Sequence, residues 1–297
     1  MKDLLTIRDI SKSDIYEMFA DAKRIKIKNH NGNDLRPLLH KTIITTFPPT
    51  SLRTKISFES GINQLGGDII NLSLDPEGNE LLEDKVKYLN NWVDYLIIRY
   101  PEQNIIEEIA ELAEFSVVNA MSKKYHPCEV LSDLFTLYEL KGNLSNLKFV
   151  FVGEGANIAN SWFNAAAKLD LNLTQVCPEG FEVKSEIVEY ARENSECDVN
   201  ITHELVEGLS GADIILTDGW PPHGYKTNEQ FSKYQINLEN IGYANNDCIV
   251  NPCPPFTRGE EVSAGIIDSD YFIGYAAKEN LLHMQKTILL NLEPEQK

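Results

Sequence analysis

Residues 42–54 read TIITTFPPTSLRT, and this stretch decides the fold. Residues 42–47 form a short β-branched run that predicts a buried strand, because Ile and Thr favour pleated structure. The two prolines end that strand, and the polar residues after them lead into residues 56–65, whose apolar spacing predicts a helix. A strand, a polar loop and a helix in this order form the repeating element of α/β domains.

The rest of the chain continues this alternation. In the first half, residues 68–72 and 95–98 predict strands, and residues 81–92 between them predict a helix. In the second half, four more runs predict strands: residues 148–152, 172–176, 212–216 and 248–250. We therefore expect an α/β fold of two doubly wound parallel-sheet domains with a cleft between them.

The expected domain boundary follows a helix in the middle of the chain. Residues 129–140 have apolar side chains on one side, and Lys141 and Gly142 after them are a helix-stop signal. We place the first domain at residues 1–142 and the second at residues 143–275. A last amphipathic stretch, residues 276–292, predicts a C-terminal helix.

Bulk properties exclude several classes of protein. A length of 297 residues suits two domains, and no apolar run approaches the roughly 20 residues of a membrane-spanning helix. The N-terminus has no secretory pattern, so we expect a cytoplasmic protein. Five cysteines without CxxC spacing argue against a disulfide framework and a structural zinc site. A net charge of -18 disfavours nucleic acid as a partner.

Polar residues after the predicted strands indicate an anion site. Ser51, Arg53 and Thr54 at a helix start offer backbone N–H groups, hydroxyls and a guanidinium, which suit phosphate. An ordinary Ser or Thr helix cap with a surface arginine is the alternative. Arg99 ends a buried strand, where a charge is costly without a ligand or partner. His126 precedes Pro127 at the next helix start, a place where histidine also serves as a cap or core group.

Four segments together resemble the aspartate and ornithine carbamoyltransferases. Residues 50–59, followed by a Leu-Gly-Gly at 65–67, are similar to the S-x-R-T-R-x-S-F-E element of that family. Residues 126–134 resemble its H-P-x-Q-x-L-x-D-L, residues 152–161 the V-G-D-G-N-N-x-x-H-S of the ornithine branch, and residues 252–262 its H-C-L-P-x-x-R-G-E-E-V. Order and spacing match from about residue 3 to residue 292.

The resemblance implies a carbamoyl phosphate site with catalytic donors and no metal, nucleotide or other cofactor. Attack by an amine builds negative charge on the carbonyl oxygen, and one donor aimed at that oxygen contributes roughly 2.7 to 4 kcal/mol. It places Ser51, Arg53 and Thr54 at the phosphate, and Arg99, Thr54 and His126 at the carbonyl oxygen as the catalytic groups; Leu52, Glu129 and Cys253 complete the carbamoyl phosphate contacts.

The acceptor-binding segments match the family less well. The resemblance assigns the acceptor to Asn157, Asp218, His223, Cys253 and Pro254, with Cys253 near the attacking amine. The S-M-G segment of the ornithine enzymes is replaced by Pro-His-Gly at residues 222–224. The arginine of their C-terminal E-N-R-x-H-x-Q helix is replaced by Leu281, and the histidine of H-C-L-P by Pro252.

Two acidic residues stand where the family has other groups. Glu129 replaces the glutamine of H-P-x-Q, which both donates and accepts hydrogen bonds, whereas an ionised carboxylate only accepts. In aspartate carbamoyltransferases, the loop matching residues 73–80 carries a serine and a lysine into the neighbouring subunit's site; here Ser73 fits the serine, but Glu77 stands in place of the lysine. Glu77 and Glu129 suggest a neutral or cationic acceptor, although a solvated acidic loop without a role would look the same.

Three functional hypotheses follow. The leading one is a carbamoyltransferase that moves the carbamoyl group to the amine of an ornithine-like, neutral or cationic acceptor, with three chains in a ring and the C-terminal helix returning to the first domain. The second is a catalytically weak or inactive paralogue that serves as a binding or assembly subunit. The third, a nucleotide-dependent dehydrogenase, is weaker, because Ile158 interrupts the glycine pattern of residues 153–158.

Overall fold

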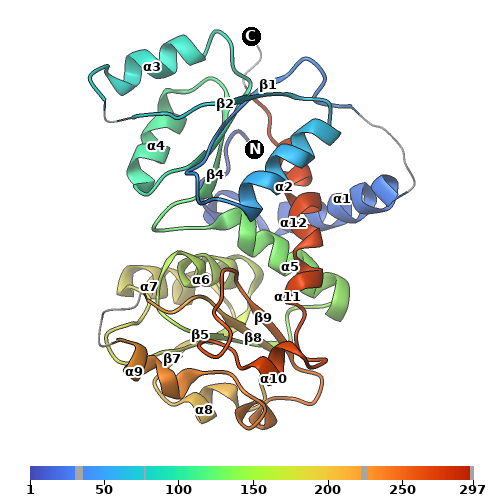
Figure 1. The fold of residues 1–297 in the computed structure, drawn as a ribbon, viewed down its shortest axis with the longest axis vertical. Helices are drawn as coiled ribbons and strands as arrows, with labels where there is room; N and C mark the ends of the chain where they lie inside the picture. Colours follow the sequence, from blue (N-terminus) through green and yellow to red (C-terminus); the bar gives the residue numbers. More distant parts are fainter. Residues whose placement is uncertain (31–35, 77, 222–226, 295–297) are drawn as a thin grey trace. The chain divides into compact units, whose positions relative to one another are not determined.

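The chain forms two compact units in a computed structural model that describes residues 1–30, 36–76, 78–221 and 227–294 (Figure 1). The first unit comprises Met1–Thr136 and Lys278–Lys297, and the second comprises Leu137–Ala277. We expected boundaries at residues 142 and 275. The units instead divide inside helix α5 (Pro127–Lys141) and directly before helix α12 (Glu279–Leu290).

The sheet of the first unit has four parallel strands in the order β2-β1-β3-β4. Because the order reverses between β1 and β3, the loops after these two strands leave the sheet on opposite sides, and such a switch point is where open α/β sheets bind ligands. The strands are β1 (Thr42–Thr46), β2 (Asp68–Asn71), β3 (Tyr95–Arg99) and β4 (Ser116–Met121).

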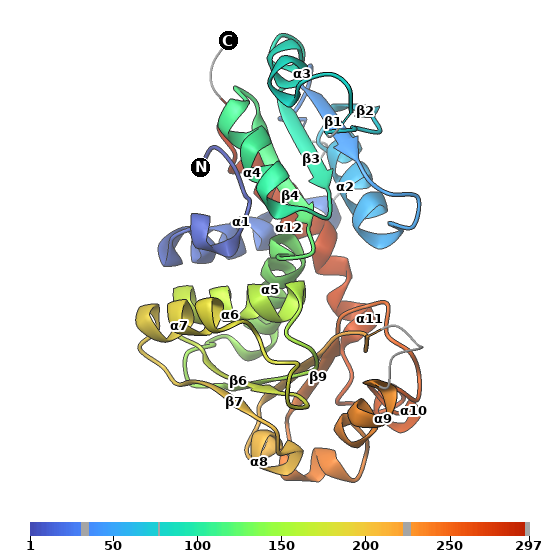
Figure 2. The same cartoon turned by 90° about the vertical axis from the view of Figure 1, so that its left-hand side faces the viewer.

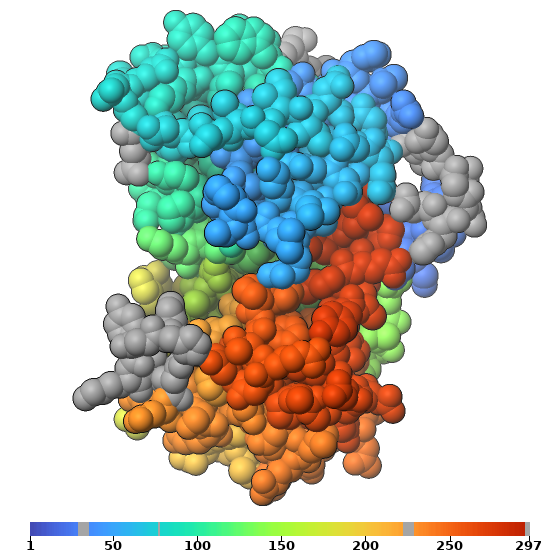
Figure 3. All heavy atoms as spheres, in the orientation of Figure 1, coloured from blue at the N-terminus to red at the C-terminus, as the bar shows by residue number. Residues whose placement is uncertain are grey.

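Helices cover both faces of this sheet. Figure 2 shows α2 on one side of the strands and α4 on the other. Helix α12 packs against α1 and α2, and in Figure 3 the red surface of this C-terminal segment borders the blue surface of α2. The helices of the first unit are η1 (Ile7–Asp9), α1 (Lys12–His30), α2 (Arg53–Gln64), α3 (Leu82–Leu89), α4 (Gln103–Leu112), α12, and α5 up to the boundary.

Strand β3 lies in the middle of the first unit's core. Its residues 95–98 are buried without the apolar and polar alternation of a one-sided strand, as expected for a parallel strand covered on both faces. Leu96 and Ile98 belong to a cluster with Ile106 and Ile109 of α4. This packing fixes the strand end at which Arg99 leaves the core.

The sheet of the second unit has five parallel strands in the order β7-β6-β5-β8-β9. Its switch point lies between β5 and β8, so the loops after these strands are the expected place for a ligand. The strands are β5 (Lys148–Val152), β6 (Asn172–Val176), β7 (Val199–Thr202), β8 (Ile214–Thr217) and β9 (Ile249–Pro252).

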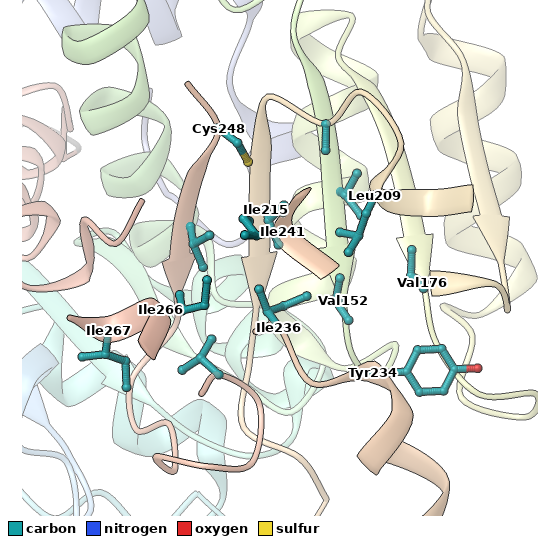
Figure 4. Close-up of a cluster of buried hydrophobic side chains, with 14 residues drawn as sticks. Val152, Val176, Leu209, Ile215, Tyr234, Ile236, Ile241, Cys248, Ile266 and Ile267 are labelled. Carbon is teal, nitrogen blue, oxygen red and sulfur yellow. The ribbon is translucent and has the colours of Figure 1, made fainter. Parts of the chain in front are cut away.

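The core of the second unit also has two sides. Figure 4 shows Val152, Ile215 and Leu209 in the cluster that includes residues from the C-terminal half of the unit. On the other face, Phe149 of β5 contacts Trp162 of α6, with ring centroids 5.9 Å apart. The remaining helices are α6 (Asn157–Leu169), α7 (Ser185–Asn194), α8 (Leu205–Leu209), α9 (Thr227–Phe231), η2 (Ser232–Tyr234), η3 (Asn240–Tyr243), α10 (Ala264–Ile267) and α11 (Gly274–Ala277).

The predicted fold class, two parallel-sheet α/β domains, is confirmed. The runs at residues 148–152 and 172–176 coincide with β5 and β6, and the other predicted strands agree with the structure apart from their ends. Among the described residues, no helix is both long and apolar enough to cross a membrane.

Candidate functional site

The loop after β1 and the end of β3 meet through Ser51 and Arg99. The guanidinium of Arg99 donates a hydrogen bond from Nη1 to Oγ of Ser51 at 3.3 Å. Ser51 is buried, and its backbone N–H donates to the carbonyl of Pro48 at 2.9 Å, which closes a tight turn. The two residues flank the switch point of the first sheet, so the structure brings together two predicted contacts of carbamoyl phosphate.

Helix α2 begins at Arg53 without a side-chain cap. Its N-cap residue is Leu52, which is 61% exposed, and no side-chain cap hydrogen bond is present at this described helix start. The interpretation of the loop as an ordinary Ser or Thr cap is therefore wrong. Arg53 is exposed and Thr54 is buried. The N–H groups of a helix's first turn and these two side chains can serve an anion.

His126 is buried at the end of the loop between β4 and α5. Ser122 fixes the loop, because its N–H donates to the carbonyl of Tyr125 at 2.9 Å and its hydroxyl to Oε1 of Gln103 at 2.7 Å. The pKa of His126 is lowered to about 4, mainly by burial; the charge of Glu129 opposes this shift, and the charges of Arg99 and Lys278 add to it. The imidazole is therefore neutral near pH 7 and can donate one hydrogen bond without carrying a charge.

Glu129 is buried and paired with a lysine of its own unit. Nζ of Lys278 contacts Oε1 of Glu129, and also lies 3.2 Å from Oδ1 of Asp133. Burial alone would raise the pKa of Glu129, but the charge and the hydrogen bond of Lys278, with smaller contributions from its other neighbours, outweigh burial and bring that pKa below its usual range. Glu129 is thus ionised, with its charge balanced by this chain's own lysine.

The predicted acceptor residues lie at the carboxyl ends of three adjacent strands of the second unit. Asn157 begins α6 after β5, Asp218 follows β8, and Cys253 with Pro254 follows β9. The backbone N–H of Cys253 donates to the carbonyl of Thr217 at 2.7 Å, which holds the Asp218 and Cys253 segments side by side. Oδ1 of Asp218 accepts from the N–H of Gly219 at 2.8 Å.

The glycines after β5 are explained by close backbone contact. A Cβ at Gly155 would lie 2.3 Å from the backbone nitrogen of Val183, and the N–H of Gly155 donates to the carbonyl of Phe181 at 2.8 Å. Gln175 joins the same two segments, because its side chain donates to the carbonyl of Gly153 and accepts from the N–H of Val183. Glycine here permits tight loop packing, a role that is independent of nucleotide binding.

A buried carboxylate that sequence analysis left without a role orders the acceptor loops. Glu261 is 1% exposed, and its Oε1 accepts from the N–H of Trp220 at 2.8 Å while Oε2 accepts from the N–H of Thr257 at 2.7 Å. It therefore links the segment after Asp218 to the segment after Cys253. The only sequence signal was its place in the G-E-E-V motif.

Other predicted residues are placed as follows. Ser73 is exposed in the segment after β2, and Leu281 is buried in α12. Glu77 and His223 lie outside the described residues. Lys278 was not predicted as a site residue. The sequence feature that could have indicated it is its place one helical turn before Leu281, which replaces the arginine of the family motif.

Comparison with known families gives matches to both units. Residues 2–139 match the domain described as aspartate/ornithine carbamoyltransferase, carbamoyl-P binding domain. Residues 145–292 match the domain described as aspartate/ornithine carbamoyltransferase, Asp/Orn binding domain.

Individual relatives match over almost the full chain. The chain is 38% identical over 296 residues to the ornithine carbamoyltransferase of Syntrophus aciditrophicus (strain SB), which covers 97% of this chain and 98% of that protein. It is 36% identical to that of Bacillus subtilis (strain 168), over 97% and 92% of the two chains. The structure of ornithine carbamoyltransferase from Pyrococcus furiosus superposes with a TM-score of 0.95 at 31% identity, covering 100% and 98% of the two chains.

Proposed function

This chain belongs to the aspartate/ornithine carbamoyltransferase family, and we propose from this premise that it moves the carbamoyl group of carbamoyl phosphate to the amine of an ornithine-like, neutral or cationic acceptor and releases phosphate. The chain is a carbamoyltransferase, a transferase of amino-acid metabolism. The observation that best supports carbamoyl phosphate as the donor is the Ser51–Arg99 contact at the first unit's switch point, next to the uncapped start of α2.

The first unit supplies the groups that this reaction requires. The N-terminus of α2, with Ser51, Arg53 and Thr54, binds the phosphate. Arg99, Thr54 and His126 donate to the carbonyl oxygen, on which negative charge builds when the amine attacks. His126 acts as a neutral donor, because burial keeps its pKa near 4.

The chemical step needs no group beyond the two substrates and these donors. The lone pair of a neutral amine attacks the carbonyl carbon, a C–N bond forms, and the C–O bond to phosphate breaks. The proton lost by the amine passes to the phosphate, which leaves. Catalysis then consists of holding the substrates in line and stabilising the oxyanion.

The second unit supplies the acceptor site. Asp218 offers a carboxylate to an ammonium group, Asn157 offers an amide, and Cys253 with Pro254 borders the attacking amine. His223 is assigned to the same site from its sequence position alone. Relatives named ornithine carbamoyltransferase favour an acceptor of the ornithine type. The charge of Glu129 is balanced by Lys278, so Glu129 itself gives no argument for a cationic acceptor.

Assembly is the second part of the proposal. We expect a homotrimer in which Ser73 of one chain enters the site of its neighbour. The exposure of Ser73 after the edge strand β2 supports this role, because a side chain that serves another subunit must reach the surface of its own.

The test is calorimetric titration with carbamoyl phosphate, followed by phosphate release with ornithine, aspartate, putrescine and lysine as acceptors. Binding, with release for one amine and not for aspartate, is the expected result. Arg53→Ala should remove binding, whereas Arg24→Ala, a change of an exposed arginine on α1 that pairs with Asp21, should leave it intact. If the wild-type protein fails to bind carbamoyl phosphate, the alternative of an inactive binding or assembly subunit replaces the proposal.

A further inference from the structure

Lys278 and Glu129 meet where two helices of the first unit approach each other. Lys278 is the N-cap residue of α12, and Glu129 and Asp133 are one turn apart on α5. The side chain of Lys278 is only 16% exposed, and those of Glu129 and Asp133 are 6% and 3% exposed. An ammonium group at the positive end of a helix dipole is unfavourable, so the two carboxylates hold it there.

Glu129 is surrounded by charged and titratable groups from several elements. His126 and Cys128 adjoin it, Asp133 lies one turn further along α5, Arg53 acts on it from α2, and Lys278 contacts it from the start of α12. Arg99 acts on His126 from β3. Lys278 contacts the carboxylate directly, and it therefore influences how much negative charge Glu129 presents to the anion site.

A carboxylate next to bound phosphate creates an electrostatic problem that glutamine does not. An unbalanced Glu129 would repel carbamoyl phosphate, and in a buried site that repulsion is weakly screened. A paired carboxylate keeps acceptor capacity, since its two oxygens offer about four lone-pair sites. The pair as a whole can thus take the place of a neutral amide acceptor.

We propose that Lys278 is a positioning residue for carbamoyl phosphate: it holds Glu129 and offsets part of the negative charge of Glu129 and Asp133, so that the Glu129 carboxylate accepts a hydrogen bond from the carbamoyl NH2 group with less repulsion of the phosphate. The inference rests on the proposed function. In this inference, Glu129, at the family's glutamine position, and Lys278, directly before α12, act together as one ion pair.

The test measures the dissociation constant of carbamoyl phosphate from pH 6 to pH 8.5 for the wild type, Lys278→Met, Glu129→Gln and the double variant. Lys278→Met should weaken binding about tenfold or more at pH 8, because the ionised Glu129 then lacks the ammonium group that contacts it. The deficit should shrink as the pH falls and the carboxyl group of Glu129 takes up a proton. Glu129→Gln and the double variant should bind within about threefold of the wild type at every pH.

Two controls separate positioning from a general structural role. Lys278→Arg should bind carbamoyl phosphate as the wild type does, since it keeps the charge. Lys286→Met removes another buried lysine of the same helix, and it should change stability without a pH-dependent change in binding. If Lys278→Met fails to fold, Lys278→Gln carries the test, since it removes the charge but keeps a hydrogen-bond donor near both carboxylates.

The outcomes discriminate between the two proposals. Binding by Lys278→Met that equals the wild type across the pH range overturns the role of Lys278. Binding by the double variant that is as weak as that of Lys278→Met also overturns it, because the defect would then not pass through Glu129. Failure of the wild type to bind carbamoyl phosphate refutes the proposed function itself. If the wild type binds and the deficit of Lys278→Met does not change with pH, only this inference is refuted.

Discussion

Arg99, the last residue of β3, donates a hydrogen bond from Nη1 to Oγ of Ser51 in the loop after β1. The contact links two strands that are neighbours in the sheet but belong to segments 48 residues apart in the chain. It holds a guanidinium and a hydroxyl in a fixed relation to each other, and side chains that are ordered by such a contact lose less conformational entropy when a ligand binds.

Ser51→Ala tests this arrangement. The variant loses one hydrogen bond from the hydroxyl to phosphate and the partner that orients Arg99, and a hydrogen bond to a charged group contributes about 1.5 to 3 kcal/mol. We expect carbamoyl phosphate to bind roughly tenfold to a hundredfold more weakly in a calorimetric titration.

Ser57→Ala is the matched control, because the hydroxyl of Ser57 donates to backbone carbonyls within its own helix, at Arg53 and Thr54. It should bind as the wild type does. Equal weakening in both variants would mean that the loss comes from a change in α2 rather than from the Ser51 hydroxyl.

The low pKa of His126 predicts a pH dependence of stability. The unfolded side chain titrates near 6.5, and the folded one near 4. Between these values the unfolded state binds more protons, so folding loses stability as the pH falls from 6.5 toward 4, by up to about 3 kcal/mol. Urea unfolding at pH 7 and at pH 4.5 should show this loss.

His126→Asn isolates the contribution of the imidazole. Asparagine does not titrate, so the variant should lose less stability than the wild type over the same pH interval, although it is less stable at pH 7 through lost packing. Identical losses in the two proteins would show that other groups account for the acid sensitivity.

Glu261→Gln probes the link between the acceptor loops. The amide oxygen can still accept one of the two hydrogen bonds. The NH2 group, however, replaces the oxygen that accepted the other, so the backbone N–H of Trp220 or of Thr257 loses its acceptor. A buried donor left without its acceptor costs about 1 to 3 kcal/mol. We expect this loss in urea unfolding, together with a rise in the KM of the acceptor that exceeds the rise in the KM of carbamoyl phosphate.

Glu239→Gln, a change of an exposed glutamate in the same unit, should alter neither quantity. If Glu261→Gln raised both KM values equally, the loops would not serve the acceptor selectively, and Glu261 would be a purely structural residue.

Sequence patterns predicted the sheets better than they predicted charge pairing. After Lys148, residues 149–152 are continuously apolar, alternating Phe and Val, and the run coincides with β5 because a parallel strand covered on both faces is apolar throughout. Ser51, Arg53 and His126 follow from strand ends and motifs. Lys278 did not, because its partner Glu129 is 149 residues away in the chain and only the packing of α12 on the first unit brings them together. The link between Glu261 and Trp220 is likewise a contact between residues 41 positions apart.

Subunit mixing tests whether Ser73 acts in a neighbouring site. Arg53→Ala should inactivate the site of its own chain, and Ser73→Ala should impair the site of the adjacent chain in the proposed trimer. In a ring of three, every mixed trimer of the two variants contains one site with both residues intact. Random reassembly of an equal mixture should therefore restore about one quarter of the wild-type sites. Phosphate release after dissociation and reassembly measures this recovery, and unmixed variants treated identically are the control. If Ser73 serves its own chain instead, no mixed trimer contains an additional intact site, and the mixture should give only the average of the two variants.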